Sequence, residues 1–377
     1  MRIWDLERER EGLLSAISRL RFEREKSLRD SVLRIRRRIE EYKEKAVLEF
    51  CRRFDGWKKD YPFKLTREEI KEGKKSVDKK DIQVLEGMIE RVRRCHRLIK
   101  QTKRIMNLRG LRVEEDMVPV ERVLIYAPGG KAPYPSSLIM AATPAILAGV
   151  REIYVTSPAP GGIVNPYILA SAYLLGIENV YRIGGAQGIF AFALGVGDIP
   201  KVDMIVGPGN AYVEEAKKEC FGLVGIDTIA GPSELLVFAN EETFPDLVAR
   251  DLLSQAEHDE MAVLWLFSKR EDYMREVFSH LKVLVEKAPR GKIIENVLSK
   301  NTFFVRFRDE KIAIDTVNEI APEHLELIGN ESLKDQILYP GITYVGIPTP
   351  TALGDYYIGT NHILPTGGSG RFLGGLS

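Results

Sequence analysis

The amino-acid sequence predicts an α/β fold, with two Rossmann-like parallel-sheet units and a helical region at the N-terminus. Three features of the 377 residues support this fold class. The first 110 residues are dense in charge and carry apolar residues at helical spacing. Short apolar runs then alternate with helix-like segments from residue 122, and a second such series begins at residue 234. Strands that helices cover on both faces are apolar throughout, so this alternation is typical of buried parallel sheets.

The N-terminal region indicates amphipathic helices, because apolar residues three or four positions apart share one helix face. The first such stripe consists of Val32, Ile35, Ile39, Tyr42, Ala46 and Phe50. A second stripe runs from Ile82 to Ile99, with Ser76 or Asp78 as its candidate N-cap. Glutamates follow the basic run 36–38 at once, which favours a solvated helix face over a nucleic-acid site.

The two α/β series consist of short apolar runs that end in glycine- or proline-rich turns and lead into helices. The expected strands of the first series are residues 122–126, 152–156, 180–183 and 202–206. Those of the second series are residues 234–239, 262–267, 303–305, 325–328 and 343–346. We therefore expect N-terminal helices over 1–120 that pack on the second α/β unit, a first α/β unit over 121–235 and a second over 236–377.

The composition excludes several classes of protein. Lys and Arg total 55 against 54 for Asp and Glu, so no strong field attracts nucleic acid or a membrane surface. Three dispersed cysteines form neither a disulfide framework nor a CxxC motif. No stretch approaches the roughly 20 apolar residues of a membrane helix, and the N-terminus lacks the apolar core of a signal peptide. We expect a soluble, cytoplasmic protein.

Histidine is rare in this chain, and three of its five histidines, His258, His324 and His362, lie in short polar segments. Each has a carboxylate within eight positions. Imidazole binds metals and moves protons near neutral pH, so this concentration points to an enzyme. Asp355 and His362 share a loop rich in Gly, Thr, Asn and Tyr, where each is either a ligand or an ordinary turn former.

Two of these segments allow both a chemical and a structural interpretation. Gln255 and His258 stand three positions apart near a helix end, so both could reach one ion, and imidazole with an amide oxygen suits zinc. A histidine at that place could equally stabilise the helix C-terminus. Glu323 and His324 could divide the work of proton transfer. Neighbours in an extended strand point to opposite sides, however, and the pair could instead lie in a solvated loop.

Glycine turns follow three expected strands of the first series, at Pro128–Gly130, Gly184–Gly185 and Gly207–Gly209. In open α/β sheets, ligands bind at the carboxyl ends of strands, where glycine permits close backbone approach. Glycine also simply ends strands, and none of the three turns fits the GxGxxG dinucleotide fingerprint. The turns alone leave nucleotide binding open.

Seven segments occur in an order that is specific to one family. They are Tyr126-Ala-Pro-Gly-Gly130, Ile183-Gly-Gly-Ala-Gln187, Val206-Gly-Pro-Gly-Asn210, Ile229-Ala-Gly-Pro-Ser-Glu234, Ser254-Gln-Ala-Glu-His258, Ala321-Pro-Glu-His-Leu-Glu326 and Gly359-Thr-Asn-His-Ile-Leu-Pro365. With them the chain resembles the histidinol dehydrogenase family over nearly its whole length. The resemblance implies NAD-dependent, zinc-assisted oxidation of L-histidinol to L-histidine through L-histidinaldehyde, the last steps of histidine biosynthesis. It also implies a cytoplasmic homodimer without nucleic-acid or membrane partners.

The resemblance implies roles for individual residues. Gln255, His258 and Asp355 match zinc ligands of the family, where the zinc holds the imidazole and amine of the substrate. Glu323 and His324 match the family's acid/base pair. His324 would take the alcohol proton as hydride leaves, and Glu323 would activate the water that adds to the aldehyde. A neutral histidine is a suitable base near pH 7.

Substrate and cofactor positions carry over in the same way. Ser233 matches a substrate contact, and the family places the zinc ligands and His324 at the substrate as well. Tyr126, Gln187 and Asn210 match positions that contact NAD. The resemblance therefore makes the first α/β unit the NAD-binding unit and gives the second unit the metal and acid/base residues.

Members of the family usually continue for several dozen residues beyond the segment that matches 371–377. That tail carries a further zinc-ligating histidine and a substrate-binding glutamate, and it reaches the partner's site in the dimer. This sequence ends at Ser377, with no histidine after His362. Two alternatives therefore stay open: a related zinc- and NAD-dependent dehydrogenase for another small alcohol, or a C-terminally truncated, poorly active or non-catalytic relative.

Overall fold

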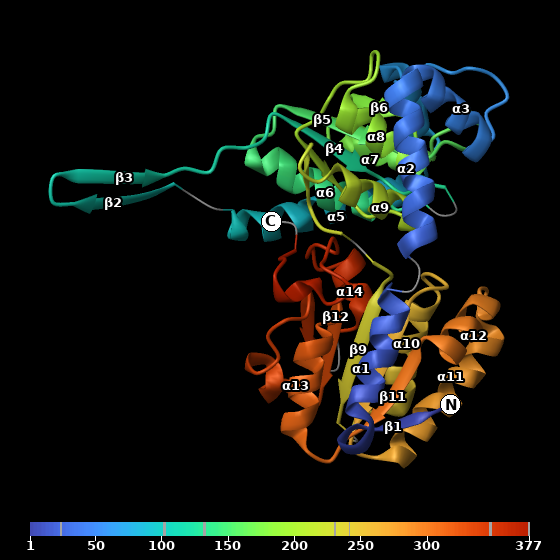
Figure 1. The fold of residues 1–377 in the computed structure, drawn as a ribbon, viewed down its shortest axis with the longest axis vertical. Coiled ribbons are helices and arrows are strands. Elements are labelled where there is room, and N and C mark those ends of the chain that lie inside the picture. The colour runs from blue at the N-terminus through green and yellow to red at the C-terminus, as the bar shows by residue number, and fades with distance from the viewer. Residues whose placement is uncertain are drawn as a thin grey trace. The chain divides into compact units, whose positions relative to one another are not determined.

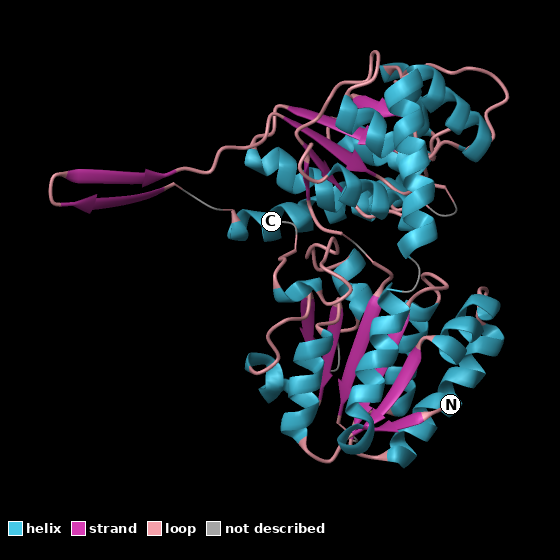
Figure 2. Ribbon diagram, viewed as in Figure 1, coloured by secondary structure: helices cyan, strands magenta, loops and turns pink. Residues whose placement is uncertain are grey.

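The computed structural model describes residues 1–22, 25–100, 103–130, 133–229, 231–240, 242–346 and 349–375. These residues form two compact units, each with its own parallel sheet (Figures 1 and 2). The six-stranded unit comprises Met1–Ser27, Ala230–Asp355 and Leu364–Gly375, and the five-stranded unit comprises Leu28–Ile229 and Tyr356–Ile363. The predicted α/β fold class with two parallel-sheet units is confirmed.

The six-stranded sheet has the order β1-β11-β10-β9-β12-β13, and every neighbouring pair is parallel. Its strands are β1 (Ile3–Asp5), β9 (Glu234–Ala239), β10 (Val263–Ser268), β11 (Thr302–Arg306), β12 (His324–Ile328) and β13 (Ile342–Val345). All residues of the central strands β9, β10 and β12 are buried. Strand β1 is absent from the sequence prediction, because three residues are too few to show a periodic pattern.

Helices cover both faces of this sheet (Figure 2). On one face, α1 (Leu6–Phe22) and α13 (Glu310–Ile320) pack against strand side chains such as Leu325 and Leu327. On the other face, α10 (Pro245–Ala256), α11 (Glu271–Lys287) and α12 (Gly291–Lys300) pack against side chains that include Ile328. Alternate residues of a strand face opposite sides, so His324 and Glu326 share the α10 face with Ile328.

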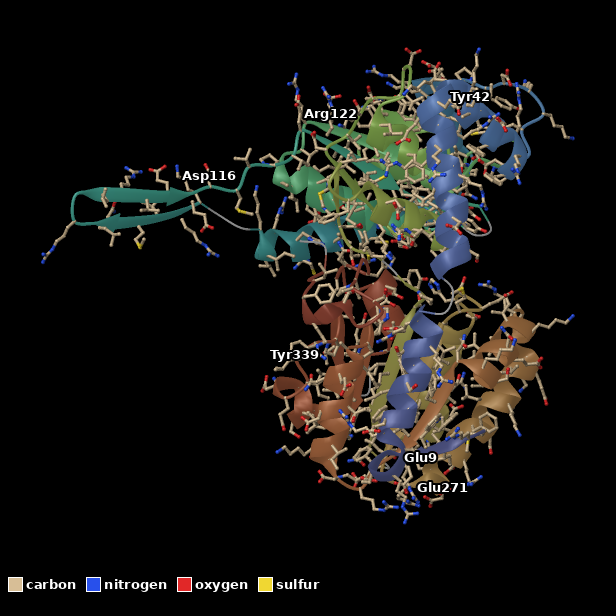
Figure 3. The ribbon with its side chains drawn as sticks, viewed as in Figure 1. Glu9, Tyr42, Asp116, Arg122, Glu271 and Tyr339 are labelled. Atoms are coloured by element: carbon tan, nitrogen blue, oxygen red, sulfur yellow. The ribbon has the colours of Figure 1, made fainter. Side chains whose placement is uncertain are left out.

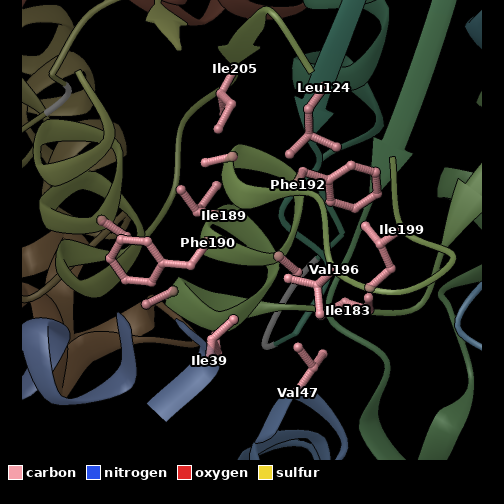
Figure 4. Packing of buried hydrophobic residues seen from close by; sticks show 14 of the residues in the cluster. Ile39, Val47, Leu124, Ile183, Ile189, Phe190, Phe192, Val196, Ile199 and Ile205 are labelled. Carbon is pink, nitrogen blue, oxygen red and sulfur yellow. The ribbon is translucent and has the colours of Figure 1, made fainter. Parts of the chain in front are cut away.

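The five-stranded sheet has the order β6-β5-β4-β7-β8 and is also parallel. Its strands are β4 (Arg122–Tyr126), β5 (Glu152–Thr156), β6 (Asn179–Tyr181), β7 (Met204–Val206) and β8 (Gly225–Ile226). The helices of this series are α6 (Pro135–Ala148), α7 (Pro166–Leu174), α8 (Gly185–Leu194) and α9 (Ala211–Cys220). Phe192 of α8 lies against Tyr154 and Tyr181 of the sheet, with ring centroids 6.0 and 4.9 Å away. Figure 4 shows Phe192 beside Leu124 of β4 in this core.

The structure distributes the N-terminal helices differently from the prediction for 1–120. Only α1 packs on the six-stranded sheet; the others belong to the five-stranded unit. They are α2 (Glu25–Tyr42), α3 (Glu44–Phe54), α4 (Arg67–Lys75) and α5 (Lys79–Ile99). The stripe from Val32 to Phe50, except for the exposed Tyr42, packs with α8 in one core cluster (Figure 4). The stripe of α5 packs with α6 and α7. Both α6 and α8 are buried over most of their length, so each needs a second apolar neighbour besides the sheet.

The N-cap alternatives for α5 are settled by a hydrogen bond. The Asp78 carboxylate accepts from the backbone N–H of Lys80 at 2.7 Å, which is the bond that an N-cap makes to the first turn. Ser76 instead ends the preceding helix α4 and donates its hydroxyl to the carbonyl of Gly73.

Residues 104–115 form a hairpin where the sequence pattern predicts helix up to residue 110. Strands β2 (Arg104–Leu108) and β3 (Leu111–Glu115) pair antiparallel through a two-residue turn with Gly110 at φ 74°, a conformation that favours glycine. All ten strand residues are exposed. Met106 pairs with Val113 and Leu108 with Leu111, so these four side chains form one face, which we call the apolar hairpin face.

No helix in the described part of the chain is long and apolar enough to cross a membrane. The outer surfaces of both units carry charged side chains (Figure 3). At the carboxyl edge of the six-stranded sheet these side chains pair with one another: Arg306 contacts Asp5 at 2.6 Å and Glu271 at 3.6 Å. Ion pairs therefore lie at this edge, and the buried polar groups described next lie at the opposite edge.

Candidate active site

The predicted metal and acid/base residues all belong to the six-stranded unit and gather at the amino edge of its sheet. Glu323 and His324 stand at the start of β12. Gln255 ends α10, which runs back to this edge after β9, and His258 lies in the turn before β10. Asp355 lies in the short helix α14 (Thr351–Tyr356). Helices of an α/β unit run antiparallel to the strands, so segments distant in sequence return to one edge.

His324 is held in one orientation by its backbone neighbours. Its ring is almost fully buried, and Nδ1 lies 3.0 Å from the carbonyl oxygen of Glu234. A carbonyl oxygen only accepts, so Nδ1 carries the proton and donates. When the ring is neutral, Nε2 holds the lone pair, and this atom has no hydrogen-bond partner among the described residues. The ring is thus fixed with its acceptor nitrogen available for a proton.

Glu323 lies beside the same ring rather than on the opposite side of the strand. Its Oε2 accepts the backbone N–H of Glu234 at 3.0 Å and stands 3.4 Å from Nδ1 of His324. Glu323 precedes the first residue of β12, so the alternation of an extended strand does not separate the two side chains. The structure brings the acid and the imidazole together in a buried place.

Three groups set the charge state of His324. Burial alone would lower its pKa, but the charge and hydrogen bonding of Glu323, the charge of Asp355 and the Glu234 carbonyl together raise the pKa to about 9. Oδ1 of Asp355 is 3.9 Å from Nε2. Burial raises the pKa of Asp355 to about 6; His324 opposes this shift and the charge of Glu323 adds to it. The carboxylate of Asp355 is therefore protonated more easily in this place than in water, unless a cation lies close to it.

Gln255, His258 and Asp355 have a donor chemistry that fits zinc. Burial lowers the pKa of His258 more than the nearby carboxylates raise it, so its imidazole is neutral, as metal binding requires. Gln255 is buried on the face of α10 that turns to the sheet. The described residues contain no cluster of three His, Cys, Asp or Glu side chains placed to hold a metal. The proposed ligands include only two side chains of these types, His258 and Asp355, and the third donor is the amide of Gln255.

Ser233 precedes β9 at the same edge and is half-buried, with its carbonyl bonded to the N–H of Val263 at 3.0 Å. The next residue, Glu234, was not singled out from the sequence. Its carboxylate is buried and accepts Nε and Nη2 of Arg21 at 3.0 and 2.8 Å. Burial raises the pKa of Glu234, and Arg21 opposes that shift. An acid at the head of an otherwise apolar strand was the signal in the sequence.

The predicted NAD-contacting residues belong to the five-stranded unit, at the carboxyl edge of its sheet. The Tyr126 hydroxyl accepts the backbone N–H of Gly185 at 3.1 Å. Gln187 is buried in the first turn of α8, where its Oε1 would stand 2.6 Å from a Cβ at Gly185. Asn210 caps α9 by accepting the N–H groups of Tyr212 and Val213. Residue 230 of the quoted motifs lies outside the described residues.

The turn at Gly207 is held by a buried ion cluster that sequence reasoning missed. Gly207 has φ 107°, and a Cβ there would stand 2.3 Å from the carbonyl oxygen of Tyr126. Its N–H donates to Asp227 at 2.7 Å, and Nζ of Lys217 donates to its carbonyl at 3.0 Å. Lys217 is fully buried and also contacts Asp227 at 2.7 Å and Glu214 at 3.3 Å. In the sequence these residues look like an ordinary charged helix face.

His362 belongs to the five-stranded unit, whereas His258 and His324 belong to the six-stranded unit. Its Nε2 is 3.1 Å from the hydroxyl of Ser137 in α6, and its backbone N–H points to the sulfur of Met140. The structure therefore gives this histidine a packing environment on α6.

Comparison with known proteins identifies close relatives. A family model described as histidinol dehydrogenase matches residues 19–377. The histidinol dehydrogenase of Nitrosomonas europaea is 42% identical over 347 residues, which cover 91% of this chain and 80% of that protein. The histidinol dehydrogenase of Aquifex aeolicus is 40% identical and covers 99% of this chain and 86% of its own length. The crystal structure of histidinol dehydrogenase from Elizabethkingia anophelis aligns with a TM-score of 0.88 at 34% identity, over 93% of this chain and 82% of that one.

Replacing Lys217 by Met should destabilise the five-stranded unit by about 3–5 kcal/mol, because the carboxylates of Asp227 and Glu214 then stay buried without a cation. Urea unfolding followed by circular dichroism measures this loss. The control is Lys218→Met, whose side chain is 41% exposed and whose loss should shift stability by less than about 1 kcal/mol. Equal midpoints for the two variants would contradict the structural role of the cluster.

Proposed function

The chain belongs to the histidinol dehydrogenase family, and from this premise we propose that it oxidises L-histidinol to L-histidine through L-histidinaldehyde, with NAD and zinc as cofactors. The family resemblance predicted from the sequence is confirmed, and membership makes the chain an oxidoreductase of histidine biosynthesis. The observation that carries the finer proposal is the orientation of His324: Nδ1 donates to a backbone carbonyl, and Nε2 is a buried acceptor without a partner among the described residues.

In the first oxidation, Nε2 of His324 takes the proton of the substrate hydroxyl while hydride leaves the carbon that bears this hydroxyl. NAD supplies the hydride acceptor in both oxidations. Zinc, held by Gln255, His258 and Asp355, would fix the substrate and supply positive charge beside Asp355. Such a charge opposes the attraction that holds the pKa of His324 at about 9, and so favours the neutral imidazole that can accept a proton.

In the second oxidation, Glu323 is placed to take a proton from the water that adds to the aldehyde. Its Oε2 is oriented by the backbone N–H of Glu234, so the carboxylate keeps a fixed position beside His324. The resulting hydrate loses a second hydride and a proton, which gives the carboxylic acid. Positioned acid/base groups of this kind contribute about 10²–10⁴ in rate each.

The cofactor half of the proposal rests on the five-stranded unit. Tyr126, Gln187 and Asn210 lie near the N-termini of α8 and α9 and near the turn at Gly207. Backbone N–H groups at helix N-termini and glycine turns without side chains suit the phosphates of a dinucleotide. The alternatives from the sequence remain a dehydrogenase of another small alcohol or a non-catalytic relative. The cytoplasmic location stays a prediction.

The purified chain should produce two NADH for each L-histidinol consumed when zinc is present. The reason is that both oxidations, alcohol to aldehyde and aldehyde to acid, each release one hydride. Absorbance of NADH and chromatographic measurement of L-histidine test this ratio. A panel of other small alcohols is the comparison: a better substrate among them would favour the related dehydrogenase, and no turnover by a folded, zinc-supplied protein would refute the proposal.

His324→Ala should lower kcat by about 10²–10⁴-fold, because it removes the proton acceptor, while histidinol binding weakens far less. Steady-state kinetics and calorimetric binding separate the two effects. His280→Ala is the matched control: this histidine lies on α11 of the same unit and its side chain is 42% exposed, so its removal should change neither value. Equal losses of turnover and binding in His324→Ala would instead indicate a ligand or structural role.

We also propose that the chain forms the homodimer expected from the sequence, with a second copy covering the apolar hairpin face. A two-stranded hairpin is at best marginally stable in water by itself, and all ten strand residues are exposed. The other face of the hairpin is polar: Glu114 pairs there with Lys103 and Arg112. Only the apolar hairpin face therefore has to be buried. Because it is uncharged, it can pack against the same face of a second copy in a two-fold dimer.

Met106→Lys should weaken the dimer by at least about tenfold, because it places a charge in the apolar contact. Ile105→Lys is the control, since this neighbouring residue is about as exposed but lies on the polar face opposite Glu114. Sedimentation velocity over a range of concentrations measures both. A monomeric wild-type protein, or equal weakening by both substitutions, would contradict this dimer contact.

A further inference from the structure

A buried carboxylate lies in the middle of β12, two residues after His324 and on the same side of the strand. Glu326 is 1% exposed, and every other residue of this strand is buried as well. A carboxyl group in such a place costs free energy unless hydrogen bonds satisfy both oxygens. Its two oxygens therefore have to be accounted for separately.

Oε1 of Glu326 is satisfied by the start of α14. It accepts both the backbone N–H and the hydroxyl of Thr351, each at 2.8 Å. Thr351 is the first residue of that helix, and Asp355 follows four residues later, one turn along the same face. The bonds to Glu326 thus fix the place at which the helix bearing Asp355 begins.

Oε2 of Glu326 is buried, and no N–H or O–H group of the described residues donates to it. The carboxyl of Asp251 in α10 lies in hydrogen-bonding contact with Glu326. Burial raises the pKa of Asp251 to about 8, with a further contribution from the charge of Glu326, and burial raises the pKa of Glu326 as well. Two carboxyls in contact do not both ionise, so one proton between them supplies the missing bond.

Asp251 occupies the same face of α10 as Gln255, which follows it by four residues, or about one turn. The pair of carboxyls therefore connects the three elements that carry the proposed site: α10 with Gln255, β12 with His324, and α14 with Asp355.

We propose that the hydrogen-bonded pair Asp251–Glu326, with Thr351, positions Gln255 and Asp355 relative to His324 and so shapes the metal-binding site. The proposal rests on the proposed function, because it assigns these residues to the support of that zinc site. A pair that acted only in folding would affect stability rather than metal affinity. Replacing a buried carboxyl pair by apolar residues often leaves stability unchanged or raises it, whereas misplaced ligand-bearing elements lower metal affinity.

The test compares Glu326→Leu with Glu326→Gln. The amide of Gln keeps an oxygen for Thr351 and offers an N–H to Asp251, so this conservative variant should retain the affinity for Zn²⁺ and the kinetics of the wild type. Leu removes both bonds, and the affinity for Zn²⁺ should fall about 10–100-fold, as for other residues that orient metal ligands. Zn²⁺ affinity is measured by competition with a chromophoric chelator, which requires no turnover.

Two further measurements separate positioning from general damage. Thr351→Val should weaken Zn²⁺ binding more than Thr351→Ser, which keeps the hydroxyl donor to Glu326. Glu319→Gln, an exposed carboxyl of α13 in the same unit, is the control and should change nothing. The thermal midpoint of each variant is recorded beside its Zn²⁺ affinity. Losses of affinity that simply follow losses of thermal stability, or equal losses in Gln and Leu variants, would overturn the proposal.

The contact between Asp251 and Glu326 can also be tested without zinc. Infrared spectroscopy should show the carbonyl band of a protonated carboxylic acid, and Asp251→Asn should remove it. Hydrogen exchange of the α14 amides should accelerate in Glu326→Leu and remain unchanged in Glu326→Gln. A wild-type protein that neither binds Zn²⁺ nor oxidises histidinol would refute the proposed function alone, while a missing infrared band with unchanged exchange would refute the pair.

Discussion

The constraint on which the site depends is that ionisable groups taken out of water at the amino edge of the six-stranded sheet must find partners there. Glu234 meets Arg21, Glu323 meets a backbone N–H and His324, and Glu326 meets Thr351. Each buried charge without such a partner would cost several kcal/mol. The partners come from different helices and strands, so the electrostatic requirement also fixes the positions of these elements.

The five-stranded unit meets the same requirement in a different way. Its buried cation, Lys217, is surrounded by Asp227, Glu214 and the carbonyl of Gly207. These groups hold a turn whose backbone approaches Tyr126 too closely for any side chain. The polar groups of this unit are thus used to shape backbone, at the carboxyl edge of the sheet. Those of the six-stranded unit keep the proposed acid/base side chains in place, at the amino edge.

The sequence predicted what periodicity and short motifs can encode: the two parallel sheets and most strands. The roles of the candidate site residues stay predictions. Segments that lack a period were missed, such as β1 with three residues and the hairpin after residue 103. The assignment of α2 to α5 failed because an apolar stripe shows that a helix packs but not against what. Arg21 and Lys217 were missed for the same reason, since a charged residue on a helix reveals its buried partner only in three dimensions.

Two buried atoms on one face of β12 differ in how their hydrogen-bonding capacity is satisfied. Nε2 of His324 and Oε2 of Glu326 are both buried, and neither has a hydrogen-bond partner among the described residues. The carboxyl of Asp251 can complete Oε2 by sharing a proton, so that oxygen is closed to further chemistry. Nε2 faces Asp355 instead, whose Oδ1 lies 3.9 Å away, beyond hydrogen-bond distance. When the ring is neutral, this nitrogen is the atom of the strand that we propose as the proton acceptor.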